Sequence, residues 1–392
     1  GVQMNSSEAV TSARSGRIYS NGGLYAGLKE LGKKNRSLSI GLEYDYSGTD
    51  KTSHEISTVR AADAVTAKDL FYKTDMNSFY GGIRLNYSEP LSDRWTAGAS
   101  VLSRYMKNTD IKDASDPDGT HNEYYSTSTD NNYLSERGEL TLQYSNDTST
   151  VQFGVRMETV QNEVKAKSMG TETVTGKGEW LTNWAPFLSY YYEKESNMIQ
   201  VGYYGMASQP SSTNITPALN ISNPVQISAG NIYLKPEFSH GLYGGLTMNN
   251  RETFAFFNMY LNGSMTTRGT VYASWMDASG VRYAIPVNSQ KPQTNSYIYM
   301  SYNRPLGKER KFTLTAGGNF VFNGSHSYQA KQRMEGLDLQ SFDYNEFMSG
   351  FWGDASGNRF YSGESGFAES RTNTFNWGAQ LQLKYSIDKL DA

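Results

Sequence analysis

Hydrophobic and polar residues alternate with a period of two along several stretches of the chain. Between residues 38 and 46, Leu, Ile and Tyr occupy the even positions and Ser, Gly, Glu and Asp occupy the odd ones. The same kind of alternation is found at 79–88, 151–158 and 379–387. Successive side chains of a β-strand point to opposite faces, so this pattern predicts strands with one apolar face and one polar face. The pattern gives about 13 such strands, and we expect an all-β chain.

Short and long connections alternate between the expected strands. Polar turns of a few residues are expected at 32–35, 89–93, 145–149, 193–197, 249–252 and 303–310. Longer connections are expected at 50–68, 110–129, 167–178, 208–236 and 329–370. The tight turn at 277–280 stands where a long loop is due, and we expect its hairpin to project beyond its neighbours. Short turns at one end and long loops at the other are typical of an antiparallel transmembrane β-barrel.

Aromatic residues flank the expected short turns. Tyr87 and Trp95 bracket one turn, and Tyr302 and Phe312 bracket another. Amphipathic rings favour the level of the lipid headgroups, and girdles of them mark the rims of membrane barrels. Aromatic cross-strand pairs also occur in soluble β-sandwiches, so a soluble secreted β-protein that binds glycans is an alternative. Combined with the alternation of turns and loops, the aromatics favour a barrel in the outer membrane.

The composition agrees with a barrel and excludes several other classes. The 392 residues include 29 Tyr and no Cys, which rules out a disulfide scaffold. No window approaches the roughly 18 apolar residues that a membrane-spanning helix needs. The net charge of −3 argues against nucleic acid as a partner. In a barrel only alternate residues face lipid, and a polar lumen would then receive the side chains of Glu43, Asp45, Arg84, Arg156, Glu158 and Lys384.

The most specific pattern runs from Gln209 to Glu237 and reads QPSSTNITPALNISNPVQISAGNIYLKPE. It resembles the segment of TonB-dependent outer-membrane receptors in which an Arg-Pro-like pair leads into a loop that returns through Gly-Asn-Pro-x-Leu-x-Pro-Glu. The matching residues are Gln209, Pro210, Gly230, Asn231, Leu234, Lys235, Pro236 and Glu237. Gln209 stands where the family often has Arg, and Ile232 stands where it usually has Pro. The Thr216-Pro217 and Asn223-Pro224 pairs look like the variant of Bacteroidetes receptor-like barrels.

The resemblance implies a function as well as a fold. A TonB-dependent receptor is a barrel of about 22 strands that holds an N-terminal plug domain and takes up a scarce, bulky nutrient. Residues 1–392 would be the barrel region, from which the plug domain and some strands are absent. The implied partners are the lipid bilayer, TonB through the plug, an extracellular siderophore, glycan or peptide, and a surface lipoprotein. A plug-less outer-membrane pore or adhesin is the first alternative.

Residues suited to catalysis do not form a recognisable arrangement. The four His do not have the spacing of an HExxH site, and the chain has no thiol. We therefore expect neither an enzyme nor a cofactor. Asp113, Asp116 and Asp118 lie in an acidic loop and are candidates for binding Ca²⁺, although an ordinary solvated loop is the favoured interpretation.

Aromatic residues also gather in the largest expected loop, at 329–370, and at the tip of the hairpin near residue 277. The candidates for contact with a ligand are Trp275, Phe351, Trp352 and Tyr361. Their rings offer flat faces to sugars, catechols or peptide side chains. The alternative, which we favour, is that they pack the loop onto itself or onto its neighbours.

Overall fold

The computed structural model describes residues 5–61, 64–168, 171–175, 179–215, 217, 219–223, 225–338, 342–387 and 390–391. Thirteen strands pair in chain order as one antiparallel meander, and we call this meander the wall. Its strands are β1 (Asn5–Lys29), β2 (Ser37–Ala61), β3 (Ala64–Pro90), β4 (Trp95–Ser115), β5 (Thr127–Ser145), β6 (Ser149–Ser168), β8 (Trp180–Lys194), β9 (Asn197–Ser208), β12 (Glu237–Asn250), β13 (Ala255–Thr267), β16 (Gln293–Leu306), β17 (Phe312–Ala330) and β18 (Phe367–Ile387). The expected number of strands agrees with this wall.

The other elements are short. They are β7 (Thr171–Thr175), α1 (Ser212–Ile215), β10 (Leu219–Asn223), β11 (Gln226–Ala229), β14 (Thr270–Met276), β15 (Arg282–Asn288), α2 (Tyr344–Phe351), α3 (Asn358–Tyr361) and β19 (Leu390–Asp391). All except β19 occur in the connections of the long-loop end. A membrane-crossing helix, which must be both long and apolar, does not occur among the residues described above.

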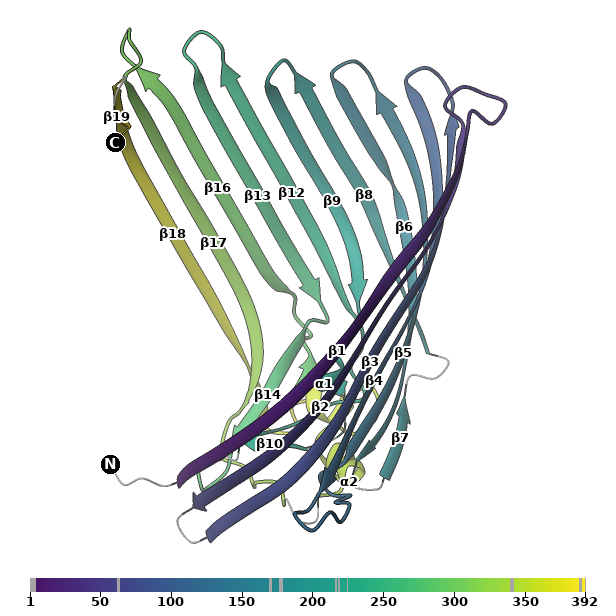
Figure 1. Cartoon of the computed structure of the whole chain (residues 1–392), viewed down its shortest axis with the longest axis vertical. Coiled ribbons are helices and arrows are strands. Elements are labelled where there is room, and N and C mark those ends of the chain that lie inside the picture. The colour runs from purple at the N-terminus through teal and green to yellow at the C-terminus, as the bar shows by residue number, and fades with distance from the viewer. Residues whose placement is uncertain are drawn as a thin grey trace.

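The wall curves but does not close (Figure 1). Its short turns lie together at the top of the view, and the small helices and the β14–β15 hairpin lie at the bottom. β1 and β18 form the two edges, and within the described ranges no pairing joins them. The predictions of an all-β antiparallel fold and of turns and loops at opposite ends are therefore confirmed.

The two faces of the wall differ as the alternation predicts. On β2 and β3, Ile40 pairs with Leu85 and Leu42 with Ile83, and all four side chains are exposed on the apolar face. Rings border this face beside the short turns: Trp95 and Tyr144 lie 5.1 Å apart, and Phe312 and Tyr385 lie 4.7 Å apart, between ring centroids. Apolar side chains on the outside of a membrane barrel are covered by lipid and not by protein. The exposed apolar face of the wall is therefore the face that meets lipid.

The expected loop at 50–68 is wrong, because β2 and β3 continue through nearly all of it. The two strands pair without interruption up to Ala61 and Ala64. At 25 and 27 residues they are much longer than the roughly 9–11 residues that cross a membrane. Outside the membrane both faces of a strand meet water. The hydrophobic alternation then fades while the backbone ladder continues, which made these strands resemble a loop.

The hairpin at 277–280 exists but does not project as expected. β14 and β15 pair with each other, while β13 pairs directly with β16 beneath them. The chain leaves the wall at Arg268, which has a φ of 55°. β15 then runs parallel to β11, and β14 briefly runs parallel to β17. The hairpin turns away from the wall because its apolar side chains are buried in a cluster with the neighbouring loops. These side chains are Val271, Ala273, Ile285 and Val287.

Candidate functional site

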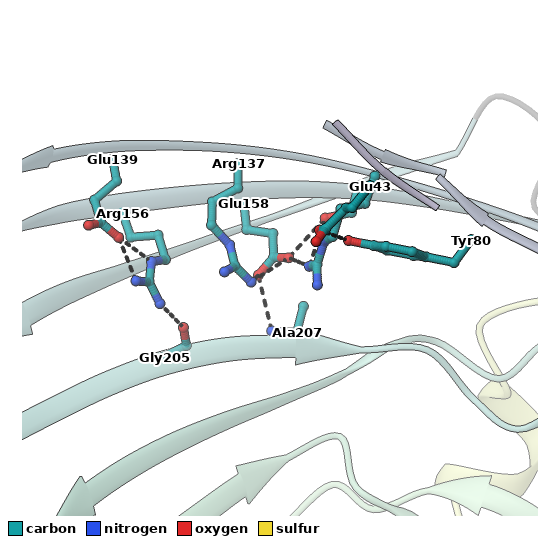
Figure 2. A network of polar contacts seen from close by, with 10 residues as sticks. Glu43, Tyr80, Arg137, Glu139, Arg156, Glu158, Gly205 and Ala207 are labelled. Carbon is teal, nitrogen blue, oxygen red and sulfur yellow. Dashed lines mark hydrogen bonds and ion pairs between the residues drawn. The ribbon is translucent and has the colours of Figure 1, made fainter. Parts of the chain in front are cut away.

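A buried ion cluster lies on the polar face of the wall (Figure 2). The side chain of Glu158 on β6 is only 1% exposed. Its carboxylate lies 2.6 Å from Nη2 of Arg104 and 3.0 Å from Nη2 of Arg137, and it accepts a hydrogen bond from Ser135. A buried carboxylate is tolerated only when it is paired and hydrogen-bonded. One acidic side chain therefore joins β4, β5 and β6.

The ladder between β8 and β9 ends next to this cluster. Its last pair towards the long-loop end is Leu188 with Tyr203. Continuing that register would place Pro186 opposite Gly205. Proline has no N–H and cannot donate to a ladder, so the carbonyl of Gly205 needs another donor.

Two side chains of β6 supply the missing partners. Nη1 of Arg156 donates to the carbonyl of Gly205 at 3.2 Å, and Glu158 accepts from the N–H of Ala207 at 3.2 Å. Arg156 is itself held by Glu139, which accepts from its Nε at 2.7 Å. Buried backbone groups have to be satisfied, so this charged network replaces strand pairing where the proline interrupts it. Figure 2 shows the two carboxylates and their guanidinium partners side by side above β9.

The loop that carries the family-like pattern packs against the polar face of β6. Pro210 is buried, and Oε1 of Gln209 is buried with no hydrogen-bond partner in the described ranges. Leu234 packs with Val164 and Ala166 of β6. The loop therefore lies against the same face as Arg156 and Glu158, nearer to the long-loop end. Thr216 and Pro224 lie outside the described residues.

Asn231 and Gly230 are fixed by contacts to other loops. Asn231 is fully buried; its Nδ2 donates to the carbonyl of Pro286 and its Oδ1 accepts from the N–H of Tyr233, both at 3.0 Å. The hydroxyl of Tyr344 donates to the carbonyl of Gly230 and accepts from the N–H of Ile232, both at 3.2 Å. Burial raises the pKa of Tyr344, so its hydroxyl stays protonated and available as a donor.

The end of the pattern is tied to the base of the hairpin. The N–H and carbonyl of Lys235 are both bonded to the side chain of Asn288, at 2.8 and 3.0 Å. Glu237 accepts from the N–H of Thr270 at 2.6 Å. Pro236 directly precedes β12, where a residue without an N–H is tolerated. The six matching residues from Gly230 to Glu237 thus form an anchored re-entry into the wall.

The candidate loop aromatics meet one another. Trp275, Phe351 and Trp352 are buried and Tyr361 is half-buried. Trp275 lies 5.8 Å from Phe351, and Trp352 lies 5.3 Å from Tyr361, between ring centroids. The loop-end cluster comprises Ile227, Ile232, Val271, Ala273, Trp275, Tyr283, Ile285, Val287, Tyr328, Phe342, Tyr344, Met348, Phe351, Trp352, Phe360 and Phe367. In this arrangement the rings hold the loops together, and a ligand-facing role stays a prediction.

The acidic loop does not assemble a metal site. Asp116 accepts from the side chain of Asn122, and Asp118 accepts from the N–H of Thr120, both at 2.9 Å. Asp113 does not form a group of potential metal ligands with these two residues. In the part of the chain that the structure describes, no three His, Asp or Glu side chains are placed to hold a metal ion.

Comparisons with known proteins agree with this geometry. The pattern that defines the outer membrane protein beta-barrel family matches residues 29–391, and the chain belongs to that family. This confirms the predicted outer-membrane β-barrel fold and the location in the outer membrane of a Gram-negative bacterium. The alternative of a soluble secreted glycan-binding protein is therefore wrong. The search of curated proteins finds no match.

Solved structures with a similar fold are outer-membrane proteins of low sequence identity. The Serratia marcescens hemophore receptor HasR, in complex with HasA and heme, is 10% identical with a TM-score of 0.46 over 78% of this chain and 55% of its own. The RagAB peptide importer is 12% identical with a TM-score of 0.48 over 80% and 36%. The Neisseria meningitidis FrpB iron transporter is 10% identical with a TM-score of 0.37 over 81% and 60%. The chain therefore spans between about a third and three fifths of these proteins.

Proposed function

We propose that residues 1–392 are the barrel region of an outer-membrane transporter that takes up a bulky nutrient: a siderophore, a glycan or a peptide. A plug domain outside this sequence fills the lumen and receives energy through TonB, as the resemblance of 209–237 implies. A surface lipoprotein is a candidate partner at the long-loop end. The barrel contributes a hydrogen-bonded wall, a polar lumen and a rim of loops, and it carries out no covalent chemistry.

The observation that carries this proposal is the width of the wall. Thirteen strands curve without bringing β1 to β18. Barrels of about 8 strands are filled by their own side chains, those of about 16–18 enclose a channel, and those of about 22 accommodate a plug. A closed barrel that contains this wall needs more than these strands. Its lumen is then wide enough for a bulky solute and for a domain that controls passage.

The anchored rim supports the same proposal. The hairpin, the loop at 331–366 and the segment ending at Glu237 are joined by the loop-end cluster and by the hydrogen bonds of Tyr344 and Asn231. A rigid scaffold that positions surface loops is the usual arrangement for capturing a ligand.

The experiment is an uptake assay in the native bacterium. A strain that lacks the gene is grown on single siderophores, glycans or peptides, and it is complemented with the full-length gene. We expect the loss of growth on one nutrient class, and rescue that a protonophore or the loss of TonB abolishes. Rescue that survives both treatments would identify a passive pore, and lost surface adherence with normal uptake would identify an adhesin.

A further inference from the structure

A polar hollow lies in the inner wall, on the short-turn side of Glu158. It has a volume of about 230 Å³ and is formed by β3, β4, β5 and β6. The residues that line it and carry polar side chains include Arg84, Ser100, Arg137, Thr141, Gln152 and Arg156. All of these lie on the face opposite the lipid-facing positions, so the hollow opens towards the lumen.

Glycines produce the hollow. Gly98 pairs with Thr141, and Thr141 pairs with Gly154, so the two glycines flank one residue across three strands. A Cβ at position 98 would lie 2.5 Å from Oγ1 of Thr141, and one at position 154 would lie 2.1 Å from the carbonyl oxygen of Leu140. Side chains are therefore disfavoured on both sides of Thr141 in this row of the wall. The space is built into the backbone packing and does not depend on a mobile side chain.

Positive charge dominates the lining. Three guanidiniums, from Arg84, Arg137 and Arg156, surround the hollow with one carboxylate, that of Glu139. Glu139 is already engaged by Arg156. Arg137 uses Nη2 for Glu158, and its Nε is buried with no hydrogen-bond partner in the part of the chain described. Arg137 therefore keeps N–H groups without a partner beside a hollow whose lining carries excess positive charge.

Arg84 is the least engaged of the three. It is exposed to the lumen, and none of the hydrogen bonds or ion pairs within the described ranges involves it. Arg84 and Arg137 both pair with Leu102, one from each side. Their Cα atoms are thus two strand spacings apart, about 10 Å, and both long side chains reach the space between them.

We propose that this hollow binds one anionic group, a carboxylate or a phosphate. Arg84 and Arg137 hold it by charge-assisted hydrogen bonds, and the hydroxyls of Ser100 and Thr141 complete the shell. The anionic group is either a dissolved anion or an acidic side chain of a protein segment inside the lumen. The inference does not depend on what the barrel transports, because the hollow belongs to the wall itself.

The first experiment uses the full-length protein in detergent and inorganic phosphate as the probe, followed by ³¹P NMR line broadening. Wild-type protein is expected to bind phosphate saturably, and Arg84→Gln is expected to weaken binding by about tenfold or more. Arg17→Gln is the matched control, since Arg17 is exposed on β1 and does not line the hollow. Unchanged gel mobility before heating checks that Arg84→Gln is folded.

The second experiment identifies an internal carboxylate. In the Arg84→Lys variant, carbodiimide links the introduced amine to any acidic side chain that contacts it, and mass spectrometry maps the link. Saturable phosphate binding without a link supports a dissolved anion. A link to an acidic residue outside the wall, without phosphate binding, supports a lumenal protein segment. Neither phosphate binding nor such a link would overturn the proposal.

Discussion

The carboxylate of Glu158 accepts a hydrogen bond from the backbone N–H of Ala207, 49 residues further along the chain. The same carboxylate forms ion pairs with both Arg104 and Arg137. One side chain therefore stabilises an ion cluster and the point at which β9 separates from β8. Its removal leaves two partly buried guanidiniums and one buried N–H without their partner.

We expect Glu158→Ala to lower the free energy of unfolding by about 3–5 kcal/mol, the range for breaking a buried ion pair. Denaturant unfolding in detergent, read by the heat-dependent shift in gel mobility, measures this change. Glu195→Ala is the control, because Glu195 forms an exposed 3.7 Å pair with Arg251 and should cost less than about 1 kcal/mol. Equal effects of the two variants would contradict the role assigned to Glu158.

Replacing either of two fully buried asparagines by Leu is expected to change the stability of the protein, in opposite directions. Asn231 bonds to Pro286 and Tyr233, whereas neither side-chain atom of Asn131 has a partner within the described ranges. We expect Asn131→Leu to stabilise the protein by about 1 kcal/mol, because it removes an unpaid desolvation cost. Asn231→Leu should destabilise it by about 2 kcal/mol or more, since it orphans two buried backbone groups. The same unfolding assay compares them, and a loss of stability in Asn131→Leu would show that its amide is satisfied.

The strand faces could be predicted from the sequence because lipid imposes a simple rule on them. Ile40, Leu42, Ile83 and Leu85 all lie where the alternation places them. The rule fails beyond the membrane, where water meets both faces, and the sequence therefore predicts a loop at 50–68 where the strands continue. The number of wall strands could be predicted because each strand alternates where it crosses the membrane. The extra length of β2 and β3 could not be predicted, because it lies outside the membrane, where the alternation is lost.

The contacts of the site could not be predicted, because each joins distant segments. The sequence placed Arg156 and Glu158 on the polar face, but it did not reveal that they satisfy Gly205 and Ala207. Pro186 was a usable signal, since a proline inside a strand leaves a neighbouring carbonyl without a donor. The turn of the hairpin was visible locally, whereas its departure from the wall depends on loops far away in the chain.

Adjacent residues on β5 test which face meets lipid. Leu140 is 62% exposed on the apolar face, and Thr141 points to the opposite face. We expect Leu140→Lys to destabilise the folded protein in lipid vesicles by about 2–4 kcal/mol, and Thr141→Lys to have a much smaller effect. Urea titration in vesicles measures both. A larger effect of Thr141→Lys would mean that the faces are assigned the wrong way round.

Tyr344→Phe should loosen the segment that follows Gly230. The variant removes only the hydroxyl that bonds to Gly230 and Ile232, and we expect a loss of about 1–2 kcal/mol. The amide of Ile232 loses its acceptor, so its hydrogen exchange should become faster while exchange in the wall strands is unchanged. Tyr25→Phe is the control, because Tyr25 is 72% exposed. Unchanged exchange at Ile232 would show that Tyr344 does not hold the segment.

Trp275 is expected to keep the loop at 331–366 closed onto the hairpin. Its ring contacts Tyr283, Phe347, Phe351 and Phe367, and its Nε1 donates to the loop carbonyl of residue 335.

Trp275→Ala should therefore cost about 3–5 kcal/mol and loosen the loop, so that trypsin cuts faster after Arg333 and Arg359, which are already exposed. Limited proteolysis followed by mass spectrometry detects the cuts. Trp377→Ala removes an equally large ring from the lipid-facing surface, where it is 67% exposed, and should leave the rate of cleavage at both sites unchanged. If Trp275→Ala instead leaves cleavage and stability unchanged but abolishes nutrient binding, the ring serves the ligand and does not hold the loop.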